Sequence, residues 1–216
     1  MKKLMIAIML CLPMAGMAQN QWERPDIQEK KAVKTEKEVT TEKEVTTEDP
    51  KYLEGAVPVV NGEVCWTLDL SVPGKNAQQI YDLVLNYLAD LVKQENQLEG
   101  SSVSLVNKSE HKIAASIKEW LVFKNQFLSL DRAKLFFNLI VECSDNHVKA
   151  DLRRINYLYE EDREGGGSHY RAEEWITDEY ALNKKKTKFY KAQGKFRKKT
   201  IDRKDELFEA IKNVLQ

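Results

Sequence analysis

The feature that most restricts the fold is a run of alternating apolar and polar residues near the middle of the chain. Every second residue between 133 and 143 is apolar: Ala133, Leu135, Phe137, Leu139, Val141 and Cys143. A period of two is typical of a strand with one buried face and one solvated face. Asp145-Asn146 then indicates a tight hairpin turn, after which the alternation resumes at Val148. The pattern predicts an antiparallel sheet whose apolar face needs a covering layer.

Other segments extend this sheet. Residues 64–72 alternate up to a Pro73-Gly74 turn, and we predict further strands at 102–107 and 113–123. Glu119 falls on the apolar side of the last of these, so we expect a bulge near Trp120 to redirect its carboxylate. After residue 152 the phase changes at Arg153-Arg154, and the apolar residues continue on the other parity to position 159.

Two helices supply the covering layer. Asn76 and Gln79 have the spacing of a capping box, and a stripe of apolar residues follows from Ile80 to Leu91. A second stripe ends the chain at 202–215, with Asp202 as the expected N-cap. The fold class is therefore α+β: an antiparallel five-stranded sheet with two helices on one face, in the order β-α-β-β-β-β-α.

The N-terminus is typical of an export signal. Lys2 and Lys3 precede an apolar run at 4–12, and small residues lead to a predicted cleavage after Ala18. Lipidation of Cys11 is a weaker alternative, because Leu10 stands where a small residue is needed. The run is too short to span a membrane, and no later run is long enough. We thus expect a protein of the periplasm or a secreted protein, not membrane-spanning after cleavage.

Residues 19–50 are predicted to be a disordered charged linker, since they contain a TEKEVT repeat and few large apolar residues. A short charged helix is the alternative. Residues 51–216 are then a single α+β domain, with a charged insertion at 160–200. Cys65 and Cys143 remain after cleavage, and the sequence leaves open whether they form a disulfide.

Three segments carry a family resemblance: WTLDLSVPGKNAQQIYDLVLNYL, LFFNLIVECSDNHVKADLRRI and DELFEAIKNVL. From Gly62 to Gln216 the chain resembles an exported bacterial domain family of unknown function with a TATA-binding-protein-like (TBP-like) fold. The resemblance implies that fold, and it implies neither an activity nor DNA binding.

No catalytic, metal-binding or cofactor-binding residues are predicted. His111, His147 and His169 are the only histidines, and they do not stand at metal-ligand spacing with cysteines or carboxylates. Gly165-Gly166-Gly167-Ser168 lacks the strand–helix context of a phosphate loop, so we interpret it as a loop tip.

Charge is the most informative polar feature. Acidic and basic residues number 34 each, which argues against a nucleic-acid partner. A local basic run with interleaved aromatics nevertheless marks one candidate site for an anion or a partner. Its members are Lys184, Lys185, Lys186, Lys188, Lys191, Lys195, Arg197, Lys198 and Lys199. The candidate partners are an envelope protein, an anionic glycan or a lipid headgroup. The alternative is that these basic residues form a solvated face or pair with the neighbouring acidic residues.

These observations favour a non-enzymatic interaction module of the bacterial cell envelope. A helix-grip carrier of an apolar small molecule or lipid is the second hypothesis, and a hydrolase with dispersed site residues is the third.

Overall fold

A six-stranded antiparallel sheet forms the larger layer of the fold. The computed structural model describes residues 48–127, 129–163 and 165–216; the predicted signal peptide and the TEKEVT repeat lie outside them. The strand order is β3-β7-β6-β5-β4, and β8 pairs with β7 beyond the end of β3. The strands are β3 (Trp66–Ser71), β4 (Ser102–Asn107), β5 (Lys112–Gln126), β6 (Ser129–Ser144), β7 (His147–Tyr159) and β8 (Ser168–Arg171). A separate two-stranded ribbon comprises β1 (Val59–Val60) and β2 (Glu63–Val64).

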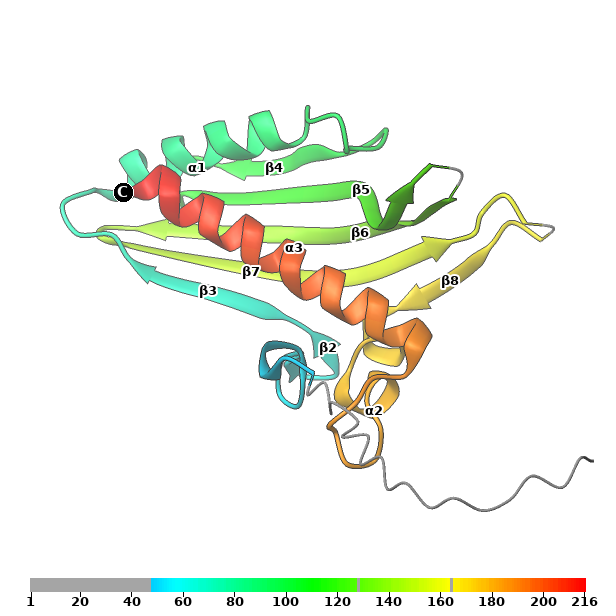
Figure 1. Cartoon of the computed structure of the whole chain (residues 1–216). Helices are drawn as coiled ribbons and strands as arrows, with labels where there is room; N and C mark the ends of the chain where they lie inside the picture. Colours follow the sequence, from blue (N-terminus) through cyan, green and yellow to red (C-terminus); the bar gives the residue numbers. More distant parts are fainter. Residues whose placement is uncertain (1–47, 128, 164) are drawn as a thin grey trace, which may run out of the picture. The chain divides into compact units, whose positions relative to one another are not determined.

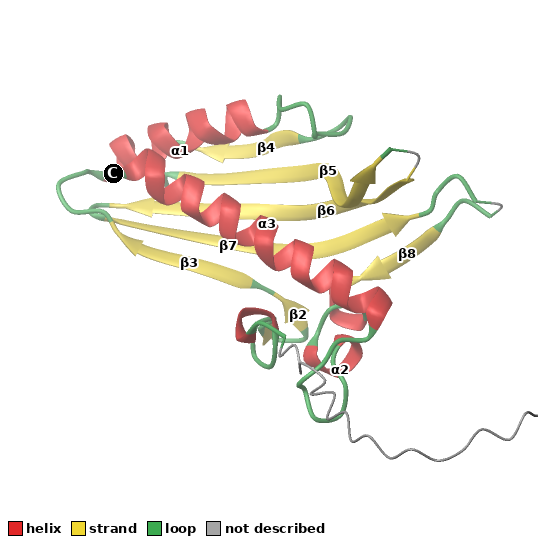
Figure 2. Cartoon of the chain, in the orientation of Figure 1, coloured by secondary structure: helices red, strands yellow, loops and turns green. Residues whose placement is uncertain are grey.

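Two long helices cover one face of this sheet. Helix α1 (Ala77–Leu91) packs across β4, β5 and β6, and α3 (Lys191–Leu215) crosses the strands diagonally (Figures 1 and 2). Their apolar stripes meet the inward residues of the central strands in one core. The short elements η1 (Pro50–Tyr52), η2 (Ala172–Glu174) and α2 (Asp178–Ala181) lie near the start of α3. The α+β class, the antiparallel sheet and the two covering helices are as predicted.

Several local predictions are confirmed. Asn76 accepts a hydrogen bond from the Gln79 amide, and the Gln79 side chain accepts one from the Asn76 amide. Asn146 has a φ of 58° in the β6–β7 turn, a left-handed conformation that asparagine tolerates. The phase change near residue 153 is a bulge in β7 opposite Phe137, with Arg154 at a φ of 56°.

The sheet has one strand more than predicted. Strand β8 lies in the charged insertion, where alternation is weak, and it forms because β7 continues past the end of β3 and leaves an edge to pair. Asn156–Tyr159 of β7 pair there with Ser168–Arg171. Tyr170 of this strand stacks on Trp175, with ring centroids 3.8 Å apart.

The final helix begins eleven residues earlier than predicted, at Lys191 rather than Asp202. Asp202 is therefore not its cap but a mid-helix residue that accepts hydrogen bonds from Lys51 and Tyr52. The longer helix is explained by buried residues that continue its covered face back through the basic run, namely the apolar Phe196 and Ile201 and the hydrogen-bonded Thr200.

Glu119 also differs from its prediction. The bulge in β5 lies at Phe123, too late to redirect the carboxylate, so Glu119 stays on the covered face and is 1% exposed. Arg203 of α3 donates to both of its carboxylate oxygens, at 2.7 and 2.9 Å, and Gln97 donates at 2.7 Å. A buried ion pair thus replaces an apolar contact between helix and sheet.

Cys65 and Cys143 are both free thiols. Cys143 pairs with Val148 of β7, whereas Cys65 precedes Trp66, which pairs with Leu152. The two partners on β7 are four residues apart, or about 13 Å along a strand. A disulfide would need the Cα atoms within about 7 Å, so this arrangement excludes one.

Candidate functional site around the start of helix α3

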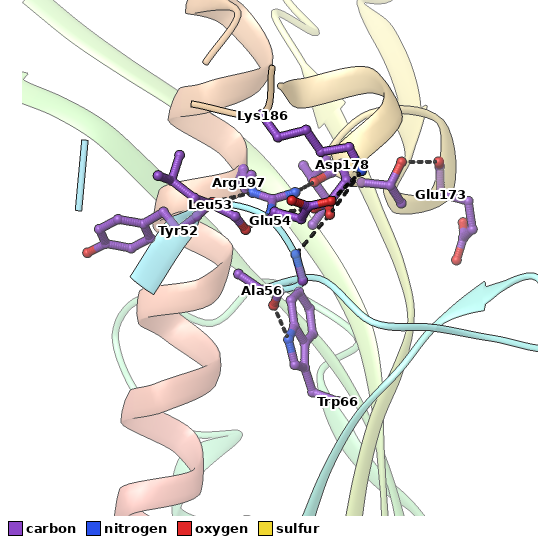
Figure 3. Close-up of polar contacts among 12 residues, drawn as sticks. Tyr52, Leu53, Glu54, Ala56, Trp66, Glu173, Asp178, Lys186 and Arg197 are labelled. Carbon is purple, nitrogen blue, oxygen red and sulfur yellow. Dashed lines mark hydrogen bonds and ion pairs between the residues drawn. The ribbon is translucent and has the colours of Figure 1, made fainter. Parts of the chain in front are cut away.

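Arg197 is the hub of this region and is fully buried (Figure 3). Its guanidinium donates to the carbonyl oxygens of Tyr52 at 2.6 Å, Leu53, and Ile176 at 2.7 Å, and to the Asp178 carboxylate at 2.7 Å. Burial lowers the pKa of Arg197, and the hydrogen bond to Asp178 opposes this shift. Predicted to contact an anion or partner, Arg197 instead joins three segments of its own chain.

Asp178 is the acidic half of this hub. It also accepts a hydrogen bond from the Gly55 amide at 2.8 Å and lies 3.6 Å from the Lys186 ammonium. Burial alone would raise the pKa of Asp178, but the Gly55 amide and Arg197 lower it overall. The arrangement holds the segment around residues 52–56 against α2 and α3 as a fixed platform.

Lys195 is engaged on the other side of the helix. Its ammonium donates to Asp131 at 2.7 Å and to the Tyr159 hydroxyl at 2.9 Å, and it lies 4.6 Å from the Phe123 ring centroid. Burial works to lower the pKa of Lys195, but the two hydrogen bonds raise it overall. A lysine held protonated in this way is a poor general base. Its role is to fasten α3 to the β5–β6 hairpin.

Two further predicted residues have acidic partners. Lys186 lies 3.2 Å from Glu54, and Lys198 lies 2.6 Å from Glu48 and over the Phe189 ring. Together with Lys195 and Arg197, they agree with the alternative interpretation, in which the basic residues form ion pairs with acidic residues of the same chain.

The remaining five lysines are exposed, and none forms an ion pair with any described residue: Lys184, Lys185, Lys188, Lys191 and Lys199. Lys199 stands apart, two turns along α3 from Lys191, beside a groove that includes Asp202 and Glu206. The other four lie together in and just after the α2–α3 loop. We call Lys184, Lys185, Lys188 and Lys191 the basic corner.

The loop that presents the basic corner is ordered by its own hydrogen bonds. The Asn183 side chain accepts from the backbone amides of Thr187 and Lys188, at 2.9 and 3.3 Å, and Leu182 bridges to Phe189. Lys186 takes a φ of 55° at the turn. The backbone therefore turns inward through Asn183 and leaves the neighbouring lysines in solvent.

Two tyrosines flank the basic corner. Tyr180 is 44% exposed and Tyr190 is 48% exposed. Tyr190 belongs to the aromatic residues that the sequence places among the lysines, but Tyr180 was missed because it follows an acidic stretch. Of the other two interleaved aromatics, Phe196 is buried and Phe189 is half-buried. The exposed surface is thus basic with a tyrosine edge.

The other polar residues do not converge. In the described ranges no group of three or more His, Cys, Asp or Glu side chains could hold a metal ion. His147 lies 2.7 Å from Asp69 on the open face of the sheet, whereas His111 contacts Gln78 of α1. Gly165, Gly166 and Gly167 all have positive φ and lead into a strand, as expected for a loop tip rather than a phosphate loop.

The comparisons with known proteins cover different shares of the chain. Residues 66–158 match the family model described as a domain of unknown function (DUF4468) with TBP-like fold. A crystal structure of a DUF4468 family protein from Bacteroides ovatus is similar with 35% sequence identity and a TM-score of 0.72, over 78% of this chain and 95% of that one.

A TBP-like protein from Parabacteroides distasonis, at 19% identity and a TM-score of 0.59, shares the fold over 74% of this chain and 97% of that one. No curated protein matches the chain. With TM-scores of 0.72 and 0.59, both structures share the overall fold of this chain. The chain therefore belongs to the DUF4468 family of domains with a TBP-like fold.

Proposed function

We propose that this chain is an exported, non-enzymatic interaction module of the bacterial cell envelope, whose basic corner binds an anionic surface. The observation that carries this proposal is the basic corner itself: four exposed lysines without acidic partners among the described residues, on an ordered loop edged by Tyr180 and Tyr190. Lipid headgroups and anionic glycans offer the same chemistry to such a surface.

Export is supported by the N-terminal pattern of basic, apolar and small residues that ends at Ala18. The charged linker predicted at 19–50, apart from residues 48–50, which belong to the described domain, would let the domain reach away from the place where the chain is released. No helix in the described part of the chain is long and apolar enough to cross a membrane. An exported domain of this kind would meet anionic groups at a surface rather than inside a bilayer core.

The open face of the sheet offers a less suitable anion site. Its basic residues alternate with acids, as in the pairs of Lys112 with Glu142 at 3.9 Å and Lys149 with Asp151 at 3.7 Å. An anionic ligand on the open face would meet acidic as well as basic side chains. The basic corner is therefore the better site for an anion.

The carrier hypothesis is disfavoured by the packing between α3 and the sheet. The enclosed cavity there, lined by residues that include Phe137, Leu152 and Leu207, holds about 10 Å³, the space of one water molecule. The larger hollow between α3 and β5, of about 530 Å³, is open to solvent and lined mostly by charged residues, so it does not suit an apolar ligand. A lipid or drug-sized ligand needs a pocket of about 300 Å³ or more. The hydrolase hypothesis gains no support from the separated histidines or from Lys195, which is held in its protonated form.

The test compares two charge-matched variants of the mature chain. The first replaces the four lysines of the basic corner by Gln; the control replaces four exposed lysines elsewhere: Lys93, Lys108, Lys112 and Lys149. Each lysine near an anionic surface contributes about 1 kcal/mol, so loss of the corner should weaken binding more than tenfold at 0.1 M salt. The control should stay within about threefold of wild type.

Binding is measured on anionic vesicles, on a soluble anionic glycan and on an acidic protein, each across a salt series. Equal loss in both variants would attribute binding to net charge and refute the assigned site. Robust turnover in a screen of ester, peptide and polysaccharide substrates would refute the non-enzymatic assignment.

A further inference from the structure

The hairpin between β5 and β6 ends in apolar side chains that the fold does not use. Phe127 is 95% exposed, Leu130 is 56% exposed and Val122 is 37% exposed. Both strands continue past the end of β4, so the hairpin projects from the sheet (Figure 2). We call Phe127 and Leu130 the hairpin tip. Single exposed apolar residues are ordinary, but a pair at the end of a projecting hairpin is a patch.

Turn geometry does not account for these residues. Other turns between paired strands of the described chain use residues that tolerate positive φ: Asn61-Gly62, Asn146 and the run at 165–167. Gln126 pairs with Ser129, so Phe127 lies in the connection between β5 and β6. Phe is a poor choice for a hairpin turn in water, and its exposed ring has no contact within the described chain that explains it.

The charges within the end of the hairpin suit an anionic surface. Residues 122–130 contain one lysine and no acid. The next residue, Asp131, is engaged by Lys195 at 2.7 Å and by the Tyr159 hydroxyl at 2.8 Å. In the neighbouring β7–β8 loop, Glu160 pairs with Arg163 and Glu161 with Lys134, whereas Asp162 is exposed and forms no ion pair with a described residue.

We propose that the hairpin tip enters the interfacial layer of an anionic phospholipid bilayer and adds an apolar contact to the electrostatic one of the basic corner. The proposal rests on the proposed function and names the bilayer as its anionic surface. The Lys195–Asp131 ion pair joins the base of the hairpin to α3 one turn after Lys191, so the two contacts belong to one rigid body.

A bilayer fits this shape better than a second copy of the chain. Neutral polar residues border the tip, including Asn125, Gln126 and Ser129, and they can hydrogen-bond in the headgroup layer. Two tips packed together would bury about 600 Å² in total, since a fully buried aromatic side chain contributes about 200 Å². A stable dimer interface needs about 1,200 Å².

The experiment uses the mature chain with vesicles of phosphatidylglycerol and phosphatidylcholine, and with pure phosphatidylcholine. The tip variant carries Phe127→Ser and Leu130→Ser. The matched control carries Leu105→Ser and Val106→Ser, which remove two side chains of β4 that are 73% and 50% exposed. Burial of the tip predicts that the tip variant loses about tenfold to a hundredfold in vesicle partitioning, while the control changes less than twofold.

A second readout reports depth directly. Phe127→Trp should show a blue shift and quenching by brominated lipid tails relative to the wild type, which has four tryptophans of its own. Leu105→Trp should show neither. Quenching of the Trp at position 127 still tests whether the hairpin tip enters the bilayer if the double Ser variant unfolds.

Four outcomes would overturn the inference. In the first, the tip variant partitions like wild type. In the second, the Trp at 127 stays unquenched on vesicles that bind the protein. In the third, the tip variant converts a dimer to a monomer in sedimentation, which would make the tip an interface between copies. In the fourth, no vesicle binds but a soluble anionic glycan binds through the basic corner; the proposed function would then stand without the bilayer.

Discussion

Replacing Arg197 by Ala should destabilise the domain strongly, although the residue lies in a basic run that looks like surface in the sequence. The substitution removes the donors of three backbone carbonyls and of the Asp178 carboxylate. Removing one partner of a buried ion pair costs about 3–5 kcal/mol, because the other charge stays buried without compensation. For a domain of this size, that loss corresponds to a decrease of about 6–20 °C in Tm.

The assay is thermal and urea unfolding followed by circular dichroism, with Lys199→Ala as the matched control from the same helix. Lys199 is exposed and without an acidic partner among the described residues, so its loss should change stability by at most about 0.5 kcal/mol. Hydrogen exchange adds a local readout, because the Gly55 amide is bonded to Asp178 and should lose protection in Arg197→Ala. If both variants unfold within about 1 kcal/mol of each other, the hub does not hold the N-terminal segment and the reasoning fails.

Three further predictions concern single groups. Gly167→Ala should destabilise the domain more than Gly166→Ala in urea unfolding. Both glycines have positive φ, but a Cβ at 167 would lie 2.7 Å from the backbone carbonyl oxygen of Tyr159, whereas one at 166 meets nothing within 4 Å. Cys143 should resist thiol reagents at pH 8 until the protein unfolds, because burial raises its pKa to about 12; fast native labelling at this site would contradict that. Asp178 has a lowered pKa, so the stability that its ionised carboxylate contributes is present above the ordinary value of 3.8 and is lost as the pH falls through the lowered pKa. Asp178→Asn should therefore reduce the decline in the free energy of unfolding below about pH 4. An unchanged decline would refute this.

The sheet and helix α1 could be predicted because each depends on a local pattern. Alternation from Ala133 to Cys143 identifies a strand, and Asn76 with Gln79 identifies a helix start, whatever lies elsewhere in the chain. Strand β8 could not be predicted, because it is specified by the length of β7 rather than by its own residues. A short charged segment becomes a strand when a neighbour leaves an unpaired edge at the right place.

The same distinction explains why the candidate site was only partly predictable. Arg197 and Lys191 are both basic residues of one run, yet the first is fully buried and the second is exposed. What separates them is helical phase, since Arg197 follows the buried Phe196 on the covered side of α3. The side of α3 on which each residue lies can be predicted only if the helix is known to begin at Lys191. The apolar residues near the start of the helix are too few to indicate this.

Glu119 shows the converse case, in which the sequence places a charged residue on an apolar face and the fold keeps it there. A bulge would have removed the conflict locally, but the chain resolves it with Arg203, 84 positions away. The cost of burying one charge is offset only by a partner that arrives with the fold, so no local pattern can reveal the pair. The hairpin tip differs in this respect: among the described residues nothing covers Phe127, so its apolar side chain still lacks the partner that Glu119 has within the chain. A bilayer would supply that partner from outside, which is why loss of vesicle binding in the tip variant, without loss of stability, is the decisive result.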